Sequence, residues 1–397
     1  EDEYEAFAVS EEPEIEETEP EVEETEPEET EPEVEETEPE VEETEPEAEV
    51  EETEPEAEIE ATEPEEVVVV PAGELSGSVA MITDIGGIND ESFNQSAWNG
   101  MEALEALGVD VSFIESRKDA DYEPNIEVKI DEGNDLIWGI GFLMKGAIGE
   151  AALDNPDQKF ALIDDFWEDD ELDNATGVMF HSEESSFLVG YIASYMTETD
   201  HVGFVLGMEG PTMYRFQYGY LAGVWYGAQE QGKEIRVDAV TIETFTDTAK
   251  GKATANKMFS DGADIVFHAA GQAGSGVIEA AKDMDKWAIG VDLDQNKLAP
   301  DNVLTSALKN VNVAIEDVSA RILEGEDLGG QTVYYGLAEG GVGIAPSSDK
   351  HVPADILEMT AEIEAQIVSG DIVIPITEDE YEAFAVSEEP EIEETEP

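Results

Sequence analysis

Residues 82–100 read ITDIGGINDESFNQSAWNG, and this stretch decides which fold class the chain belongs to. The apolar run that ends at Asp84 predicts a buried strand, and the spacing of apolar residues over roughly 92–107 predicts a helix. Two glycines and an acid separate them, and Phe93 follows near the start of the helix. Ligands of parallel sheets bind at the carboxyl ends of the strands, so this turn is a candidate binding site.

The same alternation of strand and helix continues along the chain. Further strands are predicted at 109–115, 135–141, 159–164, 201–207, 234–240, 263–271, 286–292 and 302–308. Helices are predicted up to about 131, at 213–230, 247–260, 275–283 and 310–324, and strands plus a closing helix are predicted in the last part of the body. This rhythm is typical of an α/β protein built on parallel sheets, and the length favours two sheets of similar size over one very wide sheet.

The domain boundaries follow from this reading. We predict a first lobe over 77–198, a second lobe over 199–292, and a return to the first lobe over 293–377 with some strand exchange. Acidic segments flank the body at 1–76 and 378–397.

The first 66 residues are of low complexity. The tripeptide TEP recurs at Thr18, Thr25, Thr30, Thr37, Thr44, Thr53 and Thr62. Because glutamates repel one another and prolines remove hydrogen-bond donors, we expect an extended spacer, which would hold the body away from a cell surface.

One segment of 20 residues occurs twice. The sequence EDEYEAFAVSEEPEIEETEP stands at 1–20 and again, unchanged, at 378–397. Its YEAFAV core has strand-like content, so one hypothesis is that it adds a strand to a neighbouring molecule and mediates self-association.

The charge balance excludes some partners. The chain has 101 acidic and 17 basic residues, and residues 71–377 hold 55 of the acids and all 17 bases, a difference of −38. Nucleic-acid binding requires a basic surface, and anionic lipid repels acids, so the charge argues against nucleic acid and disfavours docking on anionic lipid headgroups. The excess of negative charge is typical of a solvated surface that keeps a protein soluble. Adaptation to high salt, which would screen the repulsion between the acids, is a more specific explanation of the same excess.

Cysteine and membrane signals are also informative. The chain has no cysteine, so disulfides and thiolate chemistry are excluded, and no apolar run is long enough to cross a bilayer. It starts at Glu1 rather than Met, which suggests a processed or trimmed product. As a separate expectation, the protein is extracytoplasmic, at the cell surface or secreted, and this sequence holds no membrane anchor.

Four predicted strand ends share glycines or acids, often beside an aromatic residue: Asp84–Gly87, Gly139–Phe142, Phe267–Gly271 and Gly290–Asp294. Glycine lets a backbone approach a ligand closely, acids accept hydrogen bonds from hydroxyls, and rings offer stacking faces. The first turn lacks the G-x-G-x-x-G spacing of a dinucleotide site, and its neighbouring charges are acidic, which argues against phosphate.

At this point a family resemblance appears. DIGGINDESFNQSAWNG, GIGF, PTMYRFQYGYLAGV, VFHAAGQAGSGVIEAAK, IGVDLDQ and LTSALKN occur in this order. Together they resemble the basic membrane protein family, purine-nucleoside-binding lipoproteins that serve ABC importers. The resemblance covers about residues 77–370 and implies a type I periplasmic-binding-protein fold, in which two Rossmann-like lobes close on the ligand.

The resemblance also implies roles for particular residues. Asp84 would accept a hydrogen bond from ribose, Phe93 would stack on the purine, and Phe267 would be the opposing face. Asp292 or Asp294 would complete the sugar clamp with Lys309, and Asp164 would meet the purine edge. Ser92, Asn94 and Gly271 complete the predicted set. No cofactor and no metal are implied, and the permease in the membrane would be the protein partner. The missing lipid-bearing cysteine and the acidic tails depart from the family pattern.

Three other readings remain open. The acid-rich segments 164–174 and 292–296 superficially suggest Ca²⁺, but neither has the residue order of an EF-hand loop. Catalysis is a second possibility, although no Ser elbow or H-E-x-x-H motif occurs, and we predict no enzyme. The third is a structural or filament-forming surface protein built on a binding-protein body, with tail exchange between subunits.

Overall fold

The computed structural model describes residues 75–168 and 172–387. The predicted spacer at 1–66, the first copy of the 20-residue segment and residues 388–397 lie outside this part. Within the described part, no helix is long and apolar enough to cross a membrane.

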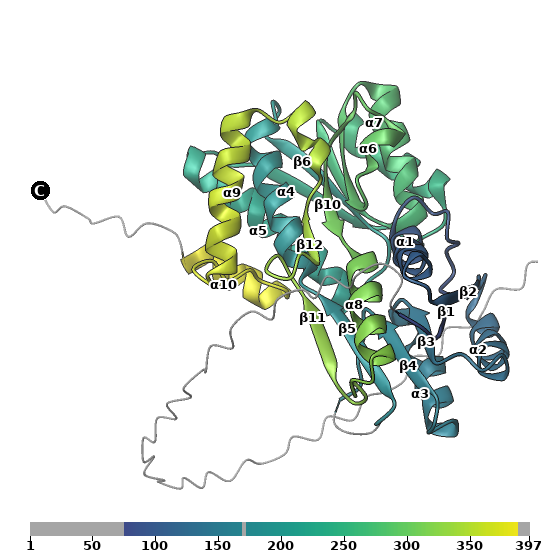
Figure 1. Ribbon diagram of the computed structural model, residues 1–397. Helices are drawn as coiled ribbons and strands as arrows, with labels where there is room; N and C mark the ends of the chain where they lie inside the picture. The colour runs from purple at the N-terminus through teal and green to yellow at the C-terminus, as the bar shows by residue number, and fades with distance from the viewer. Residues whose placement is uncertain (1–74, 169–171, 388–397) are drawn as a thin grey trace, which may run out of the picture. The chain divides into compact units, whose positions relative to one another are not determined.

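Two six-stranded sheets organise the chain, with strand orders β11-β5-β4-β3-β1-β2 and β12-β10-β9-β8-β6-β7 (Figure 1). The first lobe contains β1 (Ser78–Thr83), α1 (Phe93–Ala106), β2 (Asp110–Ile114), α2 (Tyr122–Asp131), β3 (Leu136–Ile140), α3 (Lys145–Asp154), β4 (Lys159–Ile163), β5 (Ala175–Phe180), α8 (Val311–Leu323) and β11 (Thr332–Tyr335). The second contains α4 (Ser182–Met196), β6 (His201–Leu206), α5 (Pro211–Gln231), β7 (Arg236–Thr241), α6 (Thr248–Ser260), β8 (Ile265–Ala269), α7 (Gly274–Met284), β9 (Trp287–Asp292), β10 (Val303–Lys309), β12 (Val342–Ile344) and α9 (Ala354–Val368).

All neighbouring strands are parallel except β10 and β12, which pair antiparallel. This is the predicted fold class, an α/β protein with two Rossmann-like lobes, and the prediction is confirmed. The chain crosses between the lobes three times, after β5, after β10 and after β11.

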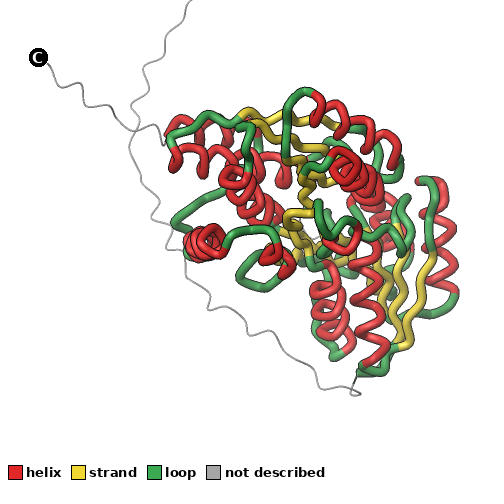
Figure 2. Tube along the Cα trace, turned by 90° about the horizontal axis from the view of Figure 1, so that it is seen from above, coloured by secondary structure: helices red, strands yellow, loops and turns green. Residues whose placement is uncertain are grey.

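The apolar strands are explained by burial on both faces. In β1, Val79 and Met81 pack with α1 and α8, while Ala80 and Ile82 pack with α2 and α3. Because successive side chains of a strand point to opposite faces, a strand covered on both sides must be apolar throughout. In the second lobe, α4, α5 and α9 cover one face and α6 and α7 the other, and Figure 2 shows helices on both sides of the strands.

The segment 293–377 does not return as a block to the first lobe. Strands β10 and β12 belong to the second sheet, α9 packs with α4, and only α8 and β11 belong to the first lobe. Helix α4, which lies inside the predicted range of the first lobe, packs on α5 in the second. Hydrophobic periodicity identifies a strand but does not say which of two similar sheets it joins.

Helices α4 and α5 approach closely through a line of glycines on α5. A Cβ atom added to Gly219 or Gly223 would lie 2.4 or 2.0 Å from the carbonyl oxygen of Glu183 or Phe187 on α4. These partners are backbone atoms, so a side chain there requires the helices to separate.

We therefore expect Gly223→Ala to lower the free energy of unfolding by about 3 kcal/mol, in the range of overpacked cores. The matched control is Gly146→Ala at an exposed position of α3, where no atom lies within 4 Å of the added Cβ, and which should be neutral or slightly stabilising. Urea unfolding of both variants measures the difference, and equal stabilities would contradict the close-packing argument.

Candidate functional site

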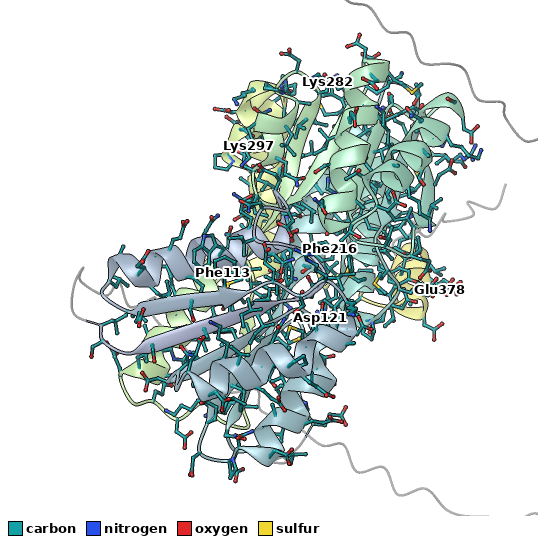
Figure 3. All side chains as sticks on the ribbon, turned by 90° about the vertical axis from the view of Figure 1, so that its right-hand side faces the viewer. Phe113, Asp121, Phe216, Lys282, Lys297 and Glu378 are labelled. Atoms are coloured by element: carbon teal, nitrogen blue, oxygen red, sulfur yellow. The ribbon has the colours of Figure 1, made fainter. Side chains whose placement is uncertain are left out.

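A pocket with about 570 Å³ of empty space, part of it open to solvent, lies where the carboxyl ends of the two sheets meet. Both lobes contribute side chains, and Phe216 is seen where they meet in Figure 3. The lining residues are Asp84, Gly86, Asp90, Phe93, Asn94, Gly141, Phe142, Asp164, Met213, Phe216, Phe245, Ala269, Ala270, Gly271, Gln272, Val291, Asp292 and Lys309.

The turn after β1 holds Asp84 in place from two sides. Its Oδ1 accepts a hydrogen bond from the backbone N–H of Gly86 and another from the Asn94 side-chain amide, both at 3.0 Å. Burial raises the pKa of the Asp84 carboxyl to about 6, although these two hydrogen bonds oppose the shift. Asp84 is thus a fixed acceptor at the mouth of the first strand.

Asp90 has a structural role at the start of α1. Its carboxylate accepts hydrogen bonds from the backbone N–H groups of Ser92, Asn94 and Gln95, at 2.8–3.0 Å, and from the Asn94 side chain. These donors are the N–H groups that a helix start leaves without intrahelical partners. Asp90 therefore positions Phe93 and Asn94, the two residues that α1 presents to the pocket.

Asp292 faces this turn from the end of β9 in the other lobe. The Ser92 hydroxyl donates a hydrogen bond to Asp292 Oδ2 across the cleft. Burial raises the pKa of Asp292 to about 7, while the charge of Lys309 and the Ser92 hydrogen bond act in the opposite direction. Near neutral pH this carboxyl therefore exists in both protonation states.

Lys309 ends β10 and forms an ion pair with Asp164, which follows β4 in the first lobe. Its Nζ lies 2.6 Å from Asp164 Oδ1, and the lysine side chain is only 2% exposed. The same Nζ lies 4.8 Å from the ring centre of Phe93 and 5.7 Å from that of Phe216. A buried ammonium requires such a partner, and Lys309 and Asp164 hold the two lobes together through it.

Two of the site acids have unusual backbone conformations. Asp164 and Asp292 have φ angles of 75° and 63°. A positive φ costs an L-residue of order 1–3 kcal/mol, and such strain gathers at functional sites. Each strand therefore ends in a sharp turn that directs its carboxylate into the cleft.

Four phenylalanines supply ring faces to the pocket. Phe93 and Phe142 come from the first lobe, and Phe216 and Phe245 from the second. Phe142 and Phe245 already contact each other edge to face, with ring centres 6.2 Å apart, and close one wall.

The prediction that Phe267 is the opposing stacking face is wrong. Its side chain is fully buried in the core of the second lobe against Phe204 and Tyr220 and does not line the pocket. Strand β8 continues for two residues beyond Phe267, so Ala269 rather than the aromatic reaches the carboxyl edge. Sequence alone does not locate the last residue of a strand this finely.

Asp294 also lies outside the pocket lining. Its carboxylate accepts hydrogen bonds from the backbone N–H of Asn296 and from the Ser347 hydroxyl, at 3.1 and 2.6 Å. It therefore caps the short helix at Gln295–Leu298 and ties it to the segment after β12, which leaves Asp292 as the acid of this strand end.

Seven predicted residues line one pocket: Asp84, Phe93, Asn94, Asp164, Gly271, Asp292 and Lys309. Ser92 contributes indirectly, through Asp292. Phe142, Phe216 and Phe245 also line the pocket, although they were not among the predicted site residues. Phe142 and Phe216 stood in the quoted motifs GIGF and PTMYRFQYGYLAGV, so motif position was the available signal, whereas Phe245 lies in a loop without such a signal.

The turn before α1 makes further contacts across the cleft. Gln295 donates a hydrogen bond to the backbone carbonyl of Glu91 at 2.8 Å, and Lys297 forms an ion pair with the Glu91 carboxylate. At the other end of the cleft, the Thr212 hydroxyl donates to the backbone carbonyl of Asp164. These contacts link the two lobes across the cleft. In the described part of the chain, no group of three or more His, Asp or Glu side chains is placed to hold a metal ion.

Comparison with known proteins gives a consistent answer. The family described as ABC transporter substrate-binding protein PnrA-like matches residues 78–378. Basic membrane protein A of Borreliella burgdorferi is 37% identical over 311 residues, which cover 77% of this chain and 90% of that protein. A Lactococcus lactis protein named ABC transporter nucleoside-binding protein BmpA is 33% identical over 318 residues, covering 75% of this chain and 88% of its own.

A solved structure agrees with both. The ABC transporter solute-binding protein of Aeropyrum pernix superposes with a TM-score of 0.70 at 30% identity, covering 77% of this chain and 95% of its own. The resemblance found in the ordered motifs is confirmed, and the chain belongs to the PnrA-like family of ABC transporter substrate-binding proteins.

Proposed function

We propose that the protein binds a purine nucleoside in the cleft between its lobes and delivers it, outside the cytoplasm, to an ABC permease. The observation that carries this proposal is the chemistry of the pocket lining. Four phenylalanines stand beside the buried carboxyls of Asp84, Asp164 and Asp292, and Lys309 is the one basic residue of the lining.

This lining suits an uncharged guest with one flat face and several hydroxyls. Carboxylates accept hydrogen bonds from hydroxyls, whereas a phosphate would meet an excess of negative charge. Stacking of a base on an aromatic ring contributes roughly 1–3 kcal/mol, and a hydrogen bond to a charged group about 1.5–3 kcal/mol. A few such contacts reach the roughly −8 kcal/mol of micromolar affinity.

We assign the parts of the nucleoside by residue chemistry. Phe93 supplies a ring face from the first lobe, and Phe216 and Phe245, in place of Phe267, supply faces from the second. Asp84 and Asp292 accept from the ribose hydroxyls, with Lys309 donating beside them, and Asp164 lies toward the purine edge. The relative whose name describes nucleoside binding supports this assignment of the ligand class.

The decisive experiment is calorimetry with inosine, guanosine, adenosine, uridine, ribose and adenosine monophosphate. We expect micromolar or tighter binding of at least one purine nucleoside, with ribose and the monophosphate much weaker, since one lacks the base and the other brings a charge. Folded protein that takes up none of the nucleosides would contradict the proposal.

Two variants separate stacking from general stability. Phe93→Ala should weaken nucleoside binding at least tenfold, about 1.4 kcal/mol, because it removes a ring face. Phe267→Leu is the matched control: it alters a buried core ring outside the pocket, so it should lower the melting temperature while leaving the dissociation constant unchanged. If the control weakens binding as much as Phe93→Ala, the assignment of Phe93 fails.

A further inference from the structure

A terminal helix outside the binding lobes packs against an aromatic surface of the second lobe. Helix α10 (Glu378–Ser387) follows α9 after nine residues and packs on α5. The ring of Phe384 meets Trp225 edge to face at 5.5 Å and Phe187 at 6.4 Å, and Tyr381 lies 6.2 Å from Tyr218. We call the surface formed by Phe187, Tyr218 and Trp225 the docking groove, and Figure 1 shows α10 beside α9 and α5.

Only one side of α10 enters the groove. Tyr381, Phe384 and Ala385 are half-buried, a spacing of three and four residues that defines one helix face, while the acids are turned to solvent. Val386 is 71% exposed. The prediction of a strand for the YEAFAV core is therefore wrong for this copy: its half-buried residues follow the helical period, and packing on α5 stabilises the helix.

The segment that fills the groove has a second copy in the chain. Residues 1–10 are identical to 378–387, so Tyr4, Phe7 and Ala8 correspond to Tyr381, Phe384 and Ala385. The family match covers 78–378, and both copies lie outside it apart from Glu378. The chain thus carries two identical copies of the segment that packs on this surface.

We propose that the docking groove is a binding site for the segment EDEYEAFAVS, and that it accepts residues 1–10 of a second molecule when α10 leaves. Helix α10 is then an internal competitor, held near the groove by its nine-residue connection at high effective concentration. A contact between the N-terminal segment of one molecule and the groove of the next is heterologous, so it builds head-to-tail chains or rings.

Charge determines how this association responds to salt. The ten-residue segment carries four acids and no base, and residues 71–377, which it approaches, carry a formal charge of −38. The two repel each other at low ionic strength, while the contact itself is aromatic. Added salt screens the repulsion, so association should strengthen with salt, the opposite of an interface built on ion pairs.

The test mixes two full-length chains. The receiving chain carries Tyr381→Ala and Phe384→Ala, which free its groove, and Tyr4→Ala and Phe7→Ala, which disable its own N-terminal copy. The donating chain is the unaltered protein. Sedimentation velocity should show a one-to-one complex that tightens as sodium chloride is raised.

Two altered donors sharpen the result. A donor with Tyr4→Ala and Phe7→Ala should bind at least about tenfold more weakly, because both anchoring rings are lost. A donor with Val9→Ala should bind like the unaltered protein, because the matching Val386 points to solvent. No complex at any salt concentration, or a complex insensitive to Tyr4 and Phe7, would overturn the proposal.

A second measurement does not need the receiving chain with its four substitutions. A synthetic peptide of residues 1–10, added to the unaltered chain, should displace α10 and speed hydrogen exchange in a fragment spanning 369–387. The same peptide with Tyr4→Ala and Phe7→Ala should not. Unchanged exchange with the unaltered peptide at saturating concentration would also overturn the proposal, and neither experiment depends on the ligand in the cleft.

Discussion

Lys309→Met is expected to weaken nucleoside binding at least 100-fold. Methionine keeps the length of the side chain but removes the charge that faces Asp164 at 2.6 Å. Breaking a buried ion pair by removing one partner costs about 3–5 kcal/mol, because the other charge stays buried. Asp164 and Lys309 belong to different lobes, so the protein relieves this cost by opening the cleft, and ligand binding must then supply the energy of closure.

Calorimetry measures the affinity of the variant for the nucleoside, and small-angle X-ray scattering measures the opening of the lobes. The control is Lys282→Met on α7, an exposed lysine far from the pocket in Figure 3, which should leave both unchanged. Adding Asp164→Asn to Lys309→Met removes the unpaired charge and should restore closure without restoring affinity. A Lys309→Met protein that binds within threefold of the original would show that the ion pair is not part of the ligand site.

Affinity is expected to rise with pH, by about 50-fold between pH 5 and pH 7 from Asp292 alone, because a carboxyl with a pKa of about 7 is about 1% ionised at pH 5 and half ionised at pH 7. The pKa of this carboxyl is raised to about 7, and that of Asp84 to about 6. A ribose hydroxyl donates best to the ionised carboxylate, so the ligand must displace protons below these values, at about tenfold per pH unit and group.

The stability of the empty protein should show the opposite trend. A carboxyl whose pKa is raised by folding binds more protons in the folded state, so its stabilising effect is complete below about pH 4 and is lost as the pH rises through about 7. For Asp292 the resulting change in the free energy of unfolding is on the order of 4 kcal/mol. Calorimetry and thermal unfolding from pH 5 to pH 8 test both trends. Asp292→Asn is the control, and a pH dependence of affinity that survives it unchanged would assign the effect to other groups.

The sequence predicts most of the fold because its signals are local. The apolar runs of β1, β3 and β8 are buried on both sides, and their limits agree with the structure to within one or two residues. Lobe membership is a different matter. Strand β10 joins the second sheet through its pairing with β9, a tertiary choice that no periodicity records.

The candidate site shows the same division. Asp84 and Asp292 were predicted because acids at strand ends are visible in the sequence, whereas Asp164 was predicted from the family resemblance. Phe267 was assigned wrongly because β8 continues for two residues beyond it. A ring at the end of the strand would lie in the pocket, but the ring of Phe267 lies in the core. Phe245 was missed because its place is set by the loop after β7, where the sequence has no regular pattern.

The three crossings between the lobes have a consequence for how the protein is made. Neither sheet is a continuous piece of the chain. The first sheet is complete only after β11, which ends at Tyr335, and the second sheet is complete only after β12, which ends at Ile344. A nascent chain leaving the ribosome therefore holds two unfinished sheets, each with an open edge, until almost the whole body has been synthesised. Both lobes reach completion together, so a chain interrupted before Tyr335 contains no finished half.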